Sequence, residues 1–181
     1  MHAPSGEFNL TRLERVIYGP GKITELGAEA ERRGLSRVLV VTTLGGFRIL
    51  DQVTGALGSR CAGVFTGIVQ HVPRGTVDAL QTEIERVNAD CLVSFGGGSP
   101  IDSCKVAIHG VAATRVLVHI AVPTTLSAAE YTSAGGVTDE STRVKGGVWD
   151  ARVAPRTVIN DPVLTMDTPD WLWVSTGMRA L

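Results

Sequence analysis

The segment Cys91-Leu-Val-Ser-Phe-Gly-Gly-Gly-Ser-Pro-Ile-Asp-Ser-Cys-Lys105 decides how this chain folds. Residues 91–95 are a largely apolar run, typical of a strand buried on both faces of a parallel sheet. Three glycines follow, and the sequence then predicts a helix from Pro100 to about Ala112, with Ser99 as N-cap, Pro100 at N1 and Asp102 at N3. A strand that passes through glycines into a helix is a repeating unit of α/β proteins.

The same alternation of strand and helix continues on both sides of this segment. Apolar runs predict strands at residues 37–42, 62–65, 115–122 and 157–160, and apolar residues at helical spacing predict helices at 22–33, 47–57 and 76–89. Because strands joined by helices pair in parallel through right-handed crossovers, the predicted fold class is α/β, with a doubly wound parallel sheet. Segments 134–138 and 145–149 predict the short strands of a hairpin or loop excursion, and a further helical segment begins at Pro169.

The composition narrows the class of protein. The chain has 181 residues, of which 44% are hydrophobic, and a formal net charge of −1 without runs of Lys or Arg. We therefore expect a globular protein that binds neither nucleic acid nor a membrane. Cys61, Cys91 and Cys104 form no CxxC motif and are odd in number, and no stretch resembles a signal peptide or a membrane span, so we expect a cytoplasmic location.

The glycines of the central segment predict an anion site. Gly96, Gly97 and Gly98 tolerate positive φ and let a ligand approach the backbone, and the N–H groups at the start of the following helix favour a phosphate. The loop matches neither GxGxxG nor the GK[ST] ending of a P-loop. The alternative is a plain strand-to-helix turn in which the glycines serve packing.

Hydroxyl side chains follow the next strand. In Val122-Pro-Thr-Thr-Leu-Ser127 they belong to Thr124, Thr125 and Ser127. If the two strands are neighbours, these hydroxyls lie beside the glycines and can hold a nucleotide, because the carboxyl ends of parallel strands meet at one edge of the sheet. Hydroxyls after a strand are also ordinary turn formers, so the alternative is a structural role.

Four motifs, in this order and spacing, carry a family resemblance. Residues 95–105, 122–125, 155–162 and 175–181 together resemble the iron-containing (group III) alcohol dehydrogenase family. Val69-Gln-His-Val-Pro73 and the pair Thr42-Thr43 resemble its maleylacetate reductase branch. The resemblance runs from about Phe8 to Leu181 and corresponds to the N-terminal, cofactor-binding half of such enzymes, so the other half is expected to be missing.

The resemblance has implications for fold and activity. It implies a Rossmann-like domain of the glycerol dehydrogenase and dehydroquinate synthase type in residues 1–162, and the start of a truncated helical metal and substrate domain in residues 163–181. It also implies an oxidoreductase that moves a hydride between NAD(H) or NADP(H) and an alcohol/carbonyl or maleylacetate-type small molecule. The catalytic residues stay unknown. We expect the chain alone to be inactive, and to form a homodimer or pair with the missing half.

In that family the glycine loop holds the cofactor's pyrophosphate, and the threonine pair contacts its adenine and ribose part. By the same resemblance Asp102 lies near the nicotinamide end and Lys145 near a ribose, although a solvated lysine is an equal alternative. The residues expected to bind the cofactor are Gly96, Gly97, Gly98, Ser99, Asp102, Thr124, Thr125, Ser127, Thr43 and Lys145.

The chain departs from the family pattern after its first predicted strand. Where the family often has an aspartate that accepts the ribose hydroxyls, this chain has Thr43. Without that carboxylate nothing repels a 2′-phosphate, so we expect weak discrimination between NADH and NADPH.

A second departure concerns the divalent metal, iron or zinc, of the family. Its first ligand is an aspartate at the position of Arg179, and arginine does not bind a divalent cation. The remaining ligands in the family are histidines that would follow Leu181. Because His2, His71, His109 and His119 stand isolated in the sequence, we expect no metal ligand in this chain.

Two other functions stay open. The chain can be a non-catalytic dinucleotide-binding module, which the sequence does not distinguish from part of a longer enzyme. It can also be the cofactor domain of a related glycerol-1-phosphate dehydrogenase or 3-dehydroquinate synthase, although segments 122–125 and 155–162 favour the alcohol dehydrogenase side.

Overall fold

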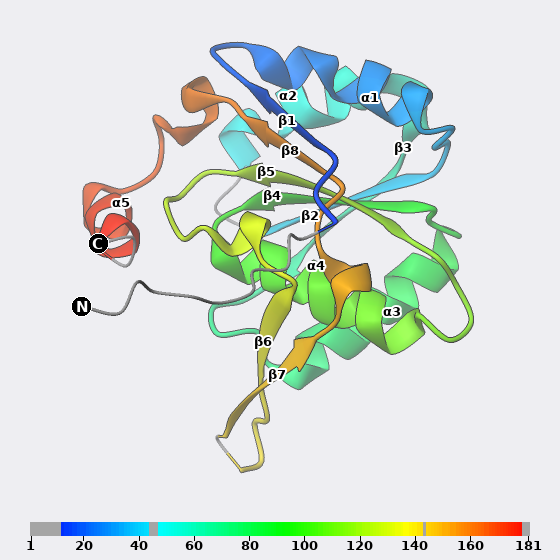
Figure 1. Ribbon diagram of the computed structural model, residues 1–181, viewed down its shortest axis with the longest axis vertical. Coiled ribbons are helices and arrows are strands. Elements are labelled where there is room, and N and C mark those ends of the chain that lie inside the picture. The colour runs from blue at the N-terminus through cyan, green and yellow to red at the C-terminus, as the bar shows by residue number, and fades with distance from the viewer. Residues whose placement is uncertain (1–11, 44–46, 143, 179–181) are drawn as a thin grey trace, which may run out of the picture.

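The centre of the molecule is a six-stranded parallel sheet (Figure 1). The computed structural model describes residues 12–43, 47–142 and 144–178. The strands, in the order β1-β8-β5-β4-β2-β3 across the sheet, are Arg15–Tyr18, Thr157–Asn160, Val118–Pro123, Cys91–Gly96, Val38–Thr43 and Cys61–Ile68. The prediction of a doubly wound parallel sheet is confirmed.

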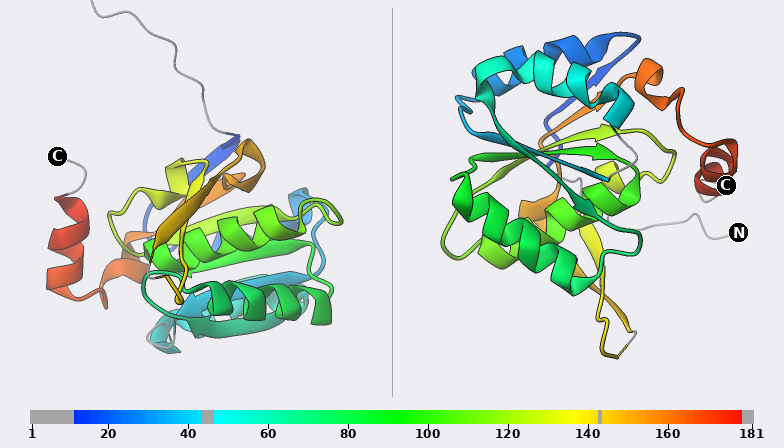
Figure 2. Two further views of the ribbon diagram at one scale, coloured as in Figure 1. Left: turned by 90° about the horizontal axis from the view of Figure 1, so that it is seen from below. Right: turned by 180° about the vertical axis from the view of Figure 1, so that it is seen from behind.

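Two helices cover each face of the sheet (Figures 1 and 2). On one face lie α1 (Leu26–Arg32) and α2 (Phe47–Leu57), and on the other α3 (Arg74–Arg86) and α4 (Gly98–Val111). The central strands are apolar on both sides, because Val38 and Val40 pack toward α1 and α2 while Leu39 and Val41 pack toward α3 and α4. This double burial explains the uninterrupted apolar runs in the sequence.

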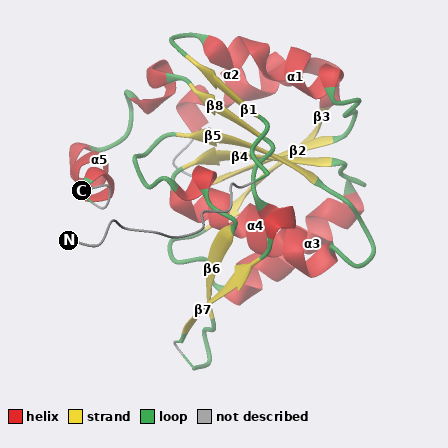
Figure 3. Cartoon of the chain, viewed as in Figure 1, coloured by secondary structure: helices red, strands yellow, loops and turns green. Residues whose placement is uncertain are grey.

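Two further elements lie outside the sheet (Figure 3). Strands β6 (Ala134–Thr138) and β7 (Lys145–Trp149) form an antiparallel hairpin whose base packs on α4. Helix α5 (Asp170–Gly177) follows β8 and the 3-10 turn Pro162–Thr165. No helix in the described part of the chain is long and apolar enough to cross a membrane.

Several predicted boundaries were wrong. Strand β1 was not predicted, because it is a short edge strand in which Ile17 alone is buried, too little for a periodic signal. Strand β5 begins at Val118 rather than Arg115, whose side chain instead bonds the Ala89 carbonyl at 3.0 Å. The first predicted helix opens with a 3-10 turn, Lys22–Glu25.

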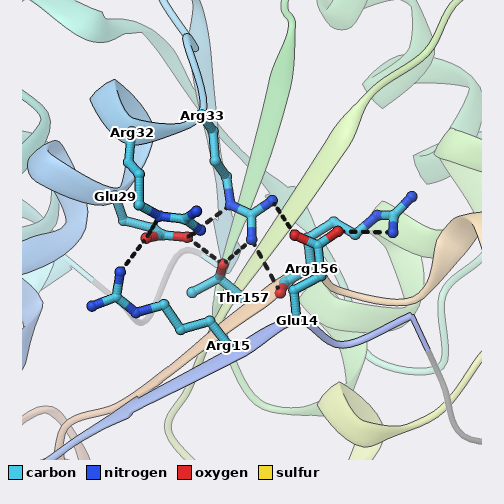
Figure 4. Close-up of polar contacts among 7 residues, drawn as sticks. All are labelled: Glu14, Arg15, Glu29, Arg32, Arg33, Arg156 and Thr157. Atoms are coloured by element: carbon cyan, nitrogen blue, oxygen red, sulfur yellow. Dashed lines mark hydrogen bonds and ion pairs between the residues drawn. The ribbon is translucent and has the colours of Figure 1, made fainter.

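The edge of the sheet at the amino ends of the strands holds a buried ionic network (Figure 4). Glu29 is almost completely buried and accepts hydrogen bonds from Arg32, Arg33 and Thr157, the last at 2.6 Å. Burial alone would raise the pKa of Glu29, but these hydrogen bonds outweigh burial and lower it to about 2. The network ties α1 to the start of β8, at the opposite edge of the sheet from the glycine loop.

Candidate functional site

A cavity of about 560 Å³ opens where the carboxyl ends of β2, β4 and β5 meet. This is the edge of a parallel sheet at which α/β proteins bind ligands. One wall consists of Thr42, Thr43, Ile49, Gln70, Phe95, Gly96, Gly97, Gly98, Ser99, Pro100, Thr124 and Thr125. The opposite wall consists of Leu164, Asp167, Thr168, Pro169, Trp171, Leu172 and Thr176, from α5 and the segment before it.

The glycine loop turns the chain sharply from β4 into α4. Gly96 has φ 139°, a conformation that favours glycine, and a Cβ there would lie 2.9 Å from Cγ of Pro100. Gly97, with φ −82°, is the N-cap, and α4 begins at Gly98. The prediction of Ser99 as N-cap with Pro100 at N1 was therefore wrong, because the helix starts within the glycines. Among the described residues no side chain caps this helix, which leaves its first N–H groups free for an anion.

The threonine loop after β5 lies against the glycine loop. A Cβ on Gly97 would lie 3.0 Å from Thr125 Cγ2 and 3.1 Å from its Oγ1, and one on Gly98 would lie 3.5 Å from Ser127 Oγ. Both hydroxyl oxygens are buried, and within the described ranges neither has a hydrogen-bond partner. Since buried hydroxyls are normally bonded, two unsatisfied ones beside an uncapped helix start indicate a missing polar ligand.

Asp102 and Lys145 lie together on the hairpin side of α4. Asp102 Oδ2 accepts a hydrogen bond of 3.2 Å from Gly136 N, and a Cβ on Gly136 would lie 3.5 Å from that oxygen and from Lys145 Nζ. Burial raises the pKa of Asp102, against the lowering effects of this hydrogen bond and of Lys105 and Lys145. Asp102, Lys145 and Ser127 do not line the cavity, although Ser127 lies next to Gly98, which does.

Apart from Ser127, the structure divides the predicted residues into two groups. Seven of them line one cavity, namely Thr43, Gly96, Gly97, Gly98, Ser99, Thr124 and Thr125. Asp102 and Lys145 form a neighbouring charged pair that the sequence did not place together, because they lie on different elements.

The sequence did not predict that α5 forms a wall of the cavity. Thr168 Oγ1 donates to the Thr124 carbonyl at 2.8 Å, and Leu126 N donates to Thr176 Oγ1 at 3.2 Å, so both contacts join this wall to the threonine loop. Trp171 lines the cavity and is 66% exposed. The spacing of Trp171 and Trp173, which cannot share one helix face, was the signal that α5 contacts more than one surface.

Two of the described histidines, His109 and His119, have protein partners for their side chains. His119 is buried between Ser94 Oγ, at 2.8 Å, and the Val153 carbonyl, and burial lowers its pKa to about 3. His109 pairs with Asp150 at 3.2 Å. Across residues 12–43, 47–142 and 144–178, no group of three His, Cys, Asp or Glu side chains could hold a metal ion. Arg179 and His2 lie outside the described residues.

Comparison with known proteins places this geometry in a family. The model of the iron-containing alcohol dehydrogenase family matches residues 14–162. The chain belongs to the iron-containing alcohol dehydrogenase family. A maleylacetate reductase from Burkholderia cepacia is 38% identical over 170 residues, which are 94% of this chain and 47% of the relative.

Solved structures of the iron-containing alcohol dehydrogenase family share the fold. A maleylacetate reductase from Agrobacterium tumefaciens, 28% identical, superposes with a TM-score of 0.86 over 99% of this chain and 49% of its own. An iron-containing alcohol dehydrogenase from Corynebacterium glutamicum, 32% identical, has a TM-score of 0.83 over 97% and 48%. The chain thus spans about half the length of the relatives it matches.

Proposed function

We propose that this chain is the nucleotide-binding half of an NAD(P)-dependent oxidoreductase of the iron-containing alcohol dehydrogenase family. The observation that carries the proposal is the pair of unsatisfied buried hydroxyls, Thr125 Oγ1 and Ser127 Oγ, beside the uncapped start of α4. A pyrophosphate offers several acceptor oxygens, to which the helix N–H groups and the hydroxyl of Thr125, which lines the cavity, can donate. The cavity of about 560 Å³ lies within the size range of cofactor sites.

The residues of the chain fit a dinucleotide at three places. Gly97 and Ser99 would hold the pyrophosphate, because both line the cavity at the uncapped start of α4. Thr43, at the end of β2, would lie toward the adenosine ribose. Asp102 would lie toward the nicotinamide, whose bound form supplies the hydride, and Lys145 toward a ribose. The protein's part is to orient that ring and exclude water around it.

We propose an alcohol/carbonyl pair or maleylacetate as the substrate of the complete enzyme. Support comes from the relatives, since proteins named maleylacetate reductase are 30–38% identical to this chain. The residues described here do not form a divalent metal site, so we derive no catalytic step through the family's metal.

Titration of the purified 181-residue chain with NADH and NADPH tests the proposal. At a ligand concentration 100 times Kd, binding stabilises the folded state by about 2.7 kcal/mol, which raises Tm by about 5–10 °C for a chain of this size. Calorimetry should give one site per chain. A chain that is folded by circular dichroism and binds neither nucleotide would contradict the assignment.

A further inference from the structure

The ammonium group of Lys105 is buried beneath the segment that follows the threonine loop. The side chain is completely inaccessible to solvent. Its Nζ donates hydrogen bonds to the carbonyls of Ala129 and Ala134 and to Thr132 Oγ1, the last two at 2.8 Å. All three N–H groups are thus used, as a buried ammonium requires if its desolvation is to be offset.

The segment that Lys105 binds, residues 124–134, connects the two walls of the cavity. It carries Thr125 and Ser127, whose hydroxyls face the glycine loop. It also accepts a hydrogen bond from Thr168 and donates one to Thr176, on the α5 side. The position of this segment therefore determines the shape of the cavity on both sides.

Local structure alone holds this segment weakly. Between the end of β5 and the start of β6 it contains only the three-residue 3-10 turn Ala129–Tyr131. Ala128, just before that turn, has φ 55°, which is unusual for a residue with a Cβ. Because Ala129, Thr132 and Ala134 lie along the rest of the segment, the bonds from Lys105 fix it as a unit.

We propose that Lys105 is a positioning residue for the nucleotide site, which holds the Thr125 and Ser127 hydroxyls opposite the glycine loop. The inference rests on the proposed nucleotide-binding function. Lys105 lies outside the residues that line the cavity, so it acts through the segment rather than by touching the ligand.

Several charged and titratable groups face Lys105. They are Asp102 and Cys104 on α4, Glu130 on the segment itself and His119 on β5, with Lys145 beyond Asp102. Burial lowers the pKa of Lys105 to about 8, against the attraction of Asp102, Glu130 and Cys104. A neutral amine keeps two N–H groups for three acceptors, so raising the pH through this value should loosen the segment.

The test compares Lys105→Met, which keeps the length of the side chain but removes its donors, with Ile108→Ala on the same helix. Ile108 is buried in the core, and its truncation should lower Tm without touching the segment. At a temperature where all chains are folded, we expect Lys105→Met to weaken NADH binding at least ~10-fold and Ile108→Ala less than ~2-fold. Thr132→Val removes one of the three acceptors of Lys105 and should weaken NADH binding less than Lys105→Met does. This variant provides the test if Lys105→Met does not fold.

Two further measurements separate positioning from general destabilisation. Amide hydrogen exchange without ligand should be faster across residues 124–134 in Lys105→Met but not in Ile108→Ala. The NADH affinity of the wild-type chain should fall between pH 7 and pH 9, and that of Lys105→Met should not change over this range.

The outcomes distinguish this inference from the proposed function. If the wild-type chain binds no nucleotide, the proposed function fails, whereas the exchange experiment still tests the anchoring of the segment. If wild type binds and Lys105→Met binds equally well, or if exchange across residues 124–134 is unchanged, the positioning role of Lys105 is overturned.

Discussion

Thr43 is the residue at which the choice between NADH and NADPH can be tested. It ends β2 and lines the cavity without bringing a negative charge to it. We expect the wild-type chain to bind both nucleotides with similar affinity. Thr43→Asp should weaken NADPH binding by about 1–3 kcal/mol through repulsion of the 2′-phosphate.

The control for Thr43→Asp is NADH, which has no 2′-phosphate and whose affinity should stay within ~3-fold of wild type. Parallel titrations of both nucleotides by calorimetry measure the difference. Equal NADPH affinity of the two chains would place Thr43 away from the ribose.

Gly97 tests the phosphate site directly. Its φ of −82° is accessible to any residue, so Gly97→Val should fold. The new side chain would press on Thr125, which lies 3.0 Å from a Cβ at this position, and would displace it from the cavity wall, so NADH binding should weaken at least ~10-fold, or about 1.4 kcal/mol. Isothermal titration measures the effect.

Gly55→Ala is the matched control for Gly97→Val. Gly55 lies in α2, and a Cβ there would have no described atom within 4 Å, so the variant should bind as wild type and be slightly more stable. Unchanged NADH affinity in Gly97→Val would show that the pyrophosphate lies elsewhere.

At the scale of elements, the network around Glu29 joins α1 to β8. Glu29→Gln leaves Arg33 and Arg32 without their buried partner and should reduce the free energy of unfolding by about 3–5 kcal/mol. Urea denaturation at pH 7 measures this. Glu31→Gln is the control, since Glu31 is 71% exposed and its pair with Arg60 should contribute less than ~1 kcal/mol.

The same network predicts how stability depends on pH. Because the pKa of Glu29 is lowered from 4.5 to about 2 on folding, its contribution is complete above the unfolded value and is lost as the pH falls from about 5 toward 2. Wild type should therefore lose stability across this range more steeply than Glu29→Gln. Parallel pH profiles of the two chains would mean that Glu29 is not held as a carboxylate.

At the scale of the whole molecule, we expect this chain to bind nucleotide without catalysing a reaction. The chain provides both described walls of the cavity, but it spans only about half the length of its relatives. We predict that the 181-residue chain binds NADH but shows no measurable oxidation of it with maleylacetate or small aldehydes, followed at 340 nm. Turnover by this chain alone would place the catalytic groups within it.

Helix α5 adds a second expectation at this scale. Trp171, Val174 and Met178 are exposed at the end of the described chain, on or next to a helix whose residues 171–174 are all apolar. Such a surface is normally covered, so we propose that a second copy of the chain packs there. Light scattering of the purified chain would show self-association if a second copy does so.

The sequence by itself predicted the layers of the fold and the place of the glycine loop. These features rest on local properties, since apolar periodicity reports burial along one element and glycines mark where the backbone must turn. The sequence also predicted that Ser99 and Thr125 belong to one site, because both follow strands that a parallel sheet brings to one edge. The family resemblance added Thr43, and all three line the cavity.

Only the tertiary structure decided which groups meet across elements. It placed Lys145 beside Asp102, brought α5 to the cavity as its second wall, and buried Lys105 beneath the segment that carries Thr125. It also moved the start of α4 from Pro100 back to Gly98. The placement of Lys145, α5 and Lys105 depends on contacts between residues far apart in the chain, which no local pattern encodes.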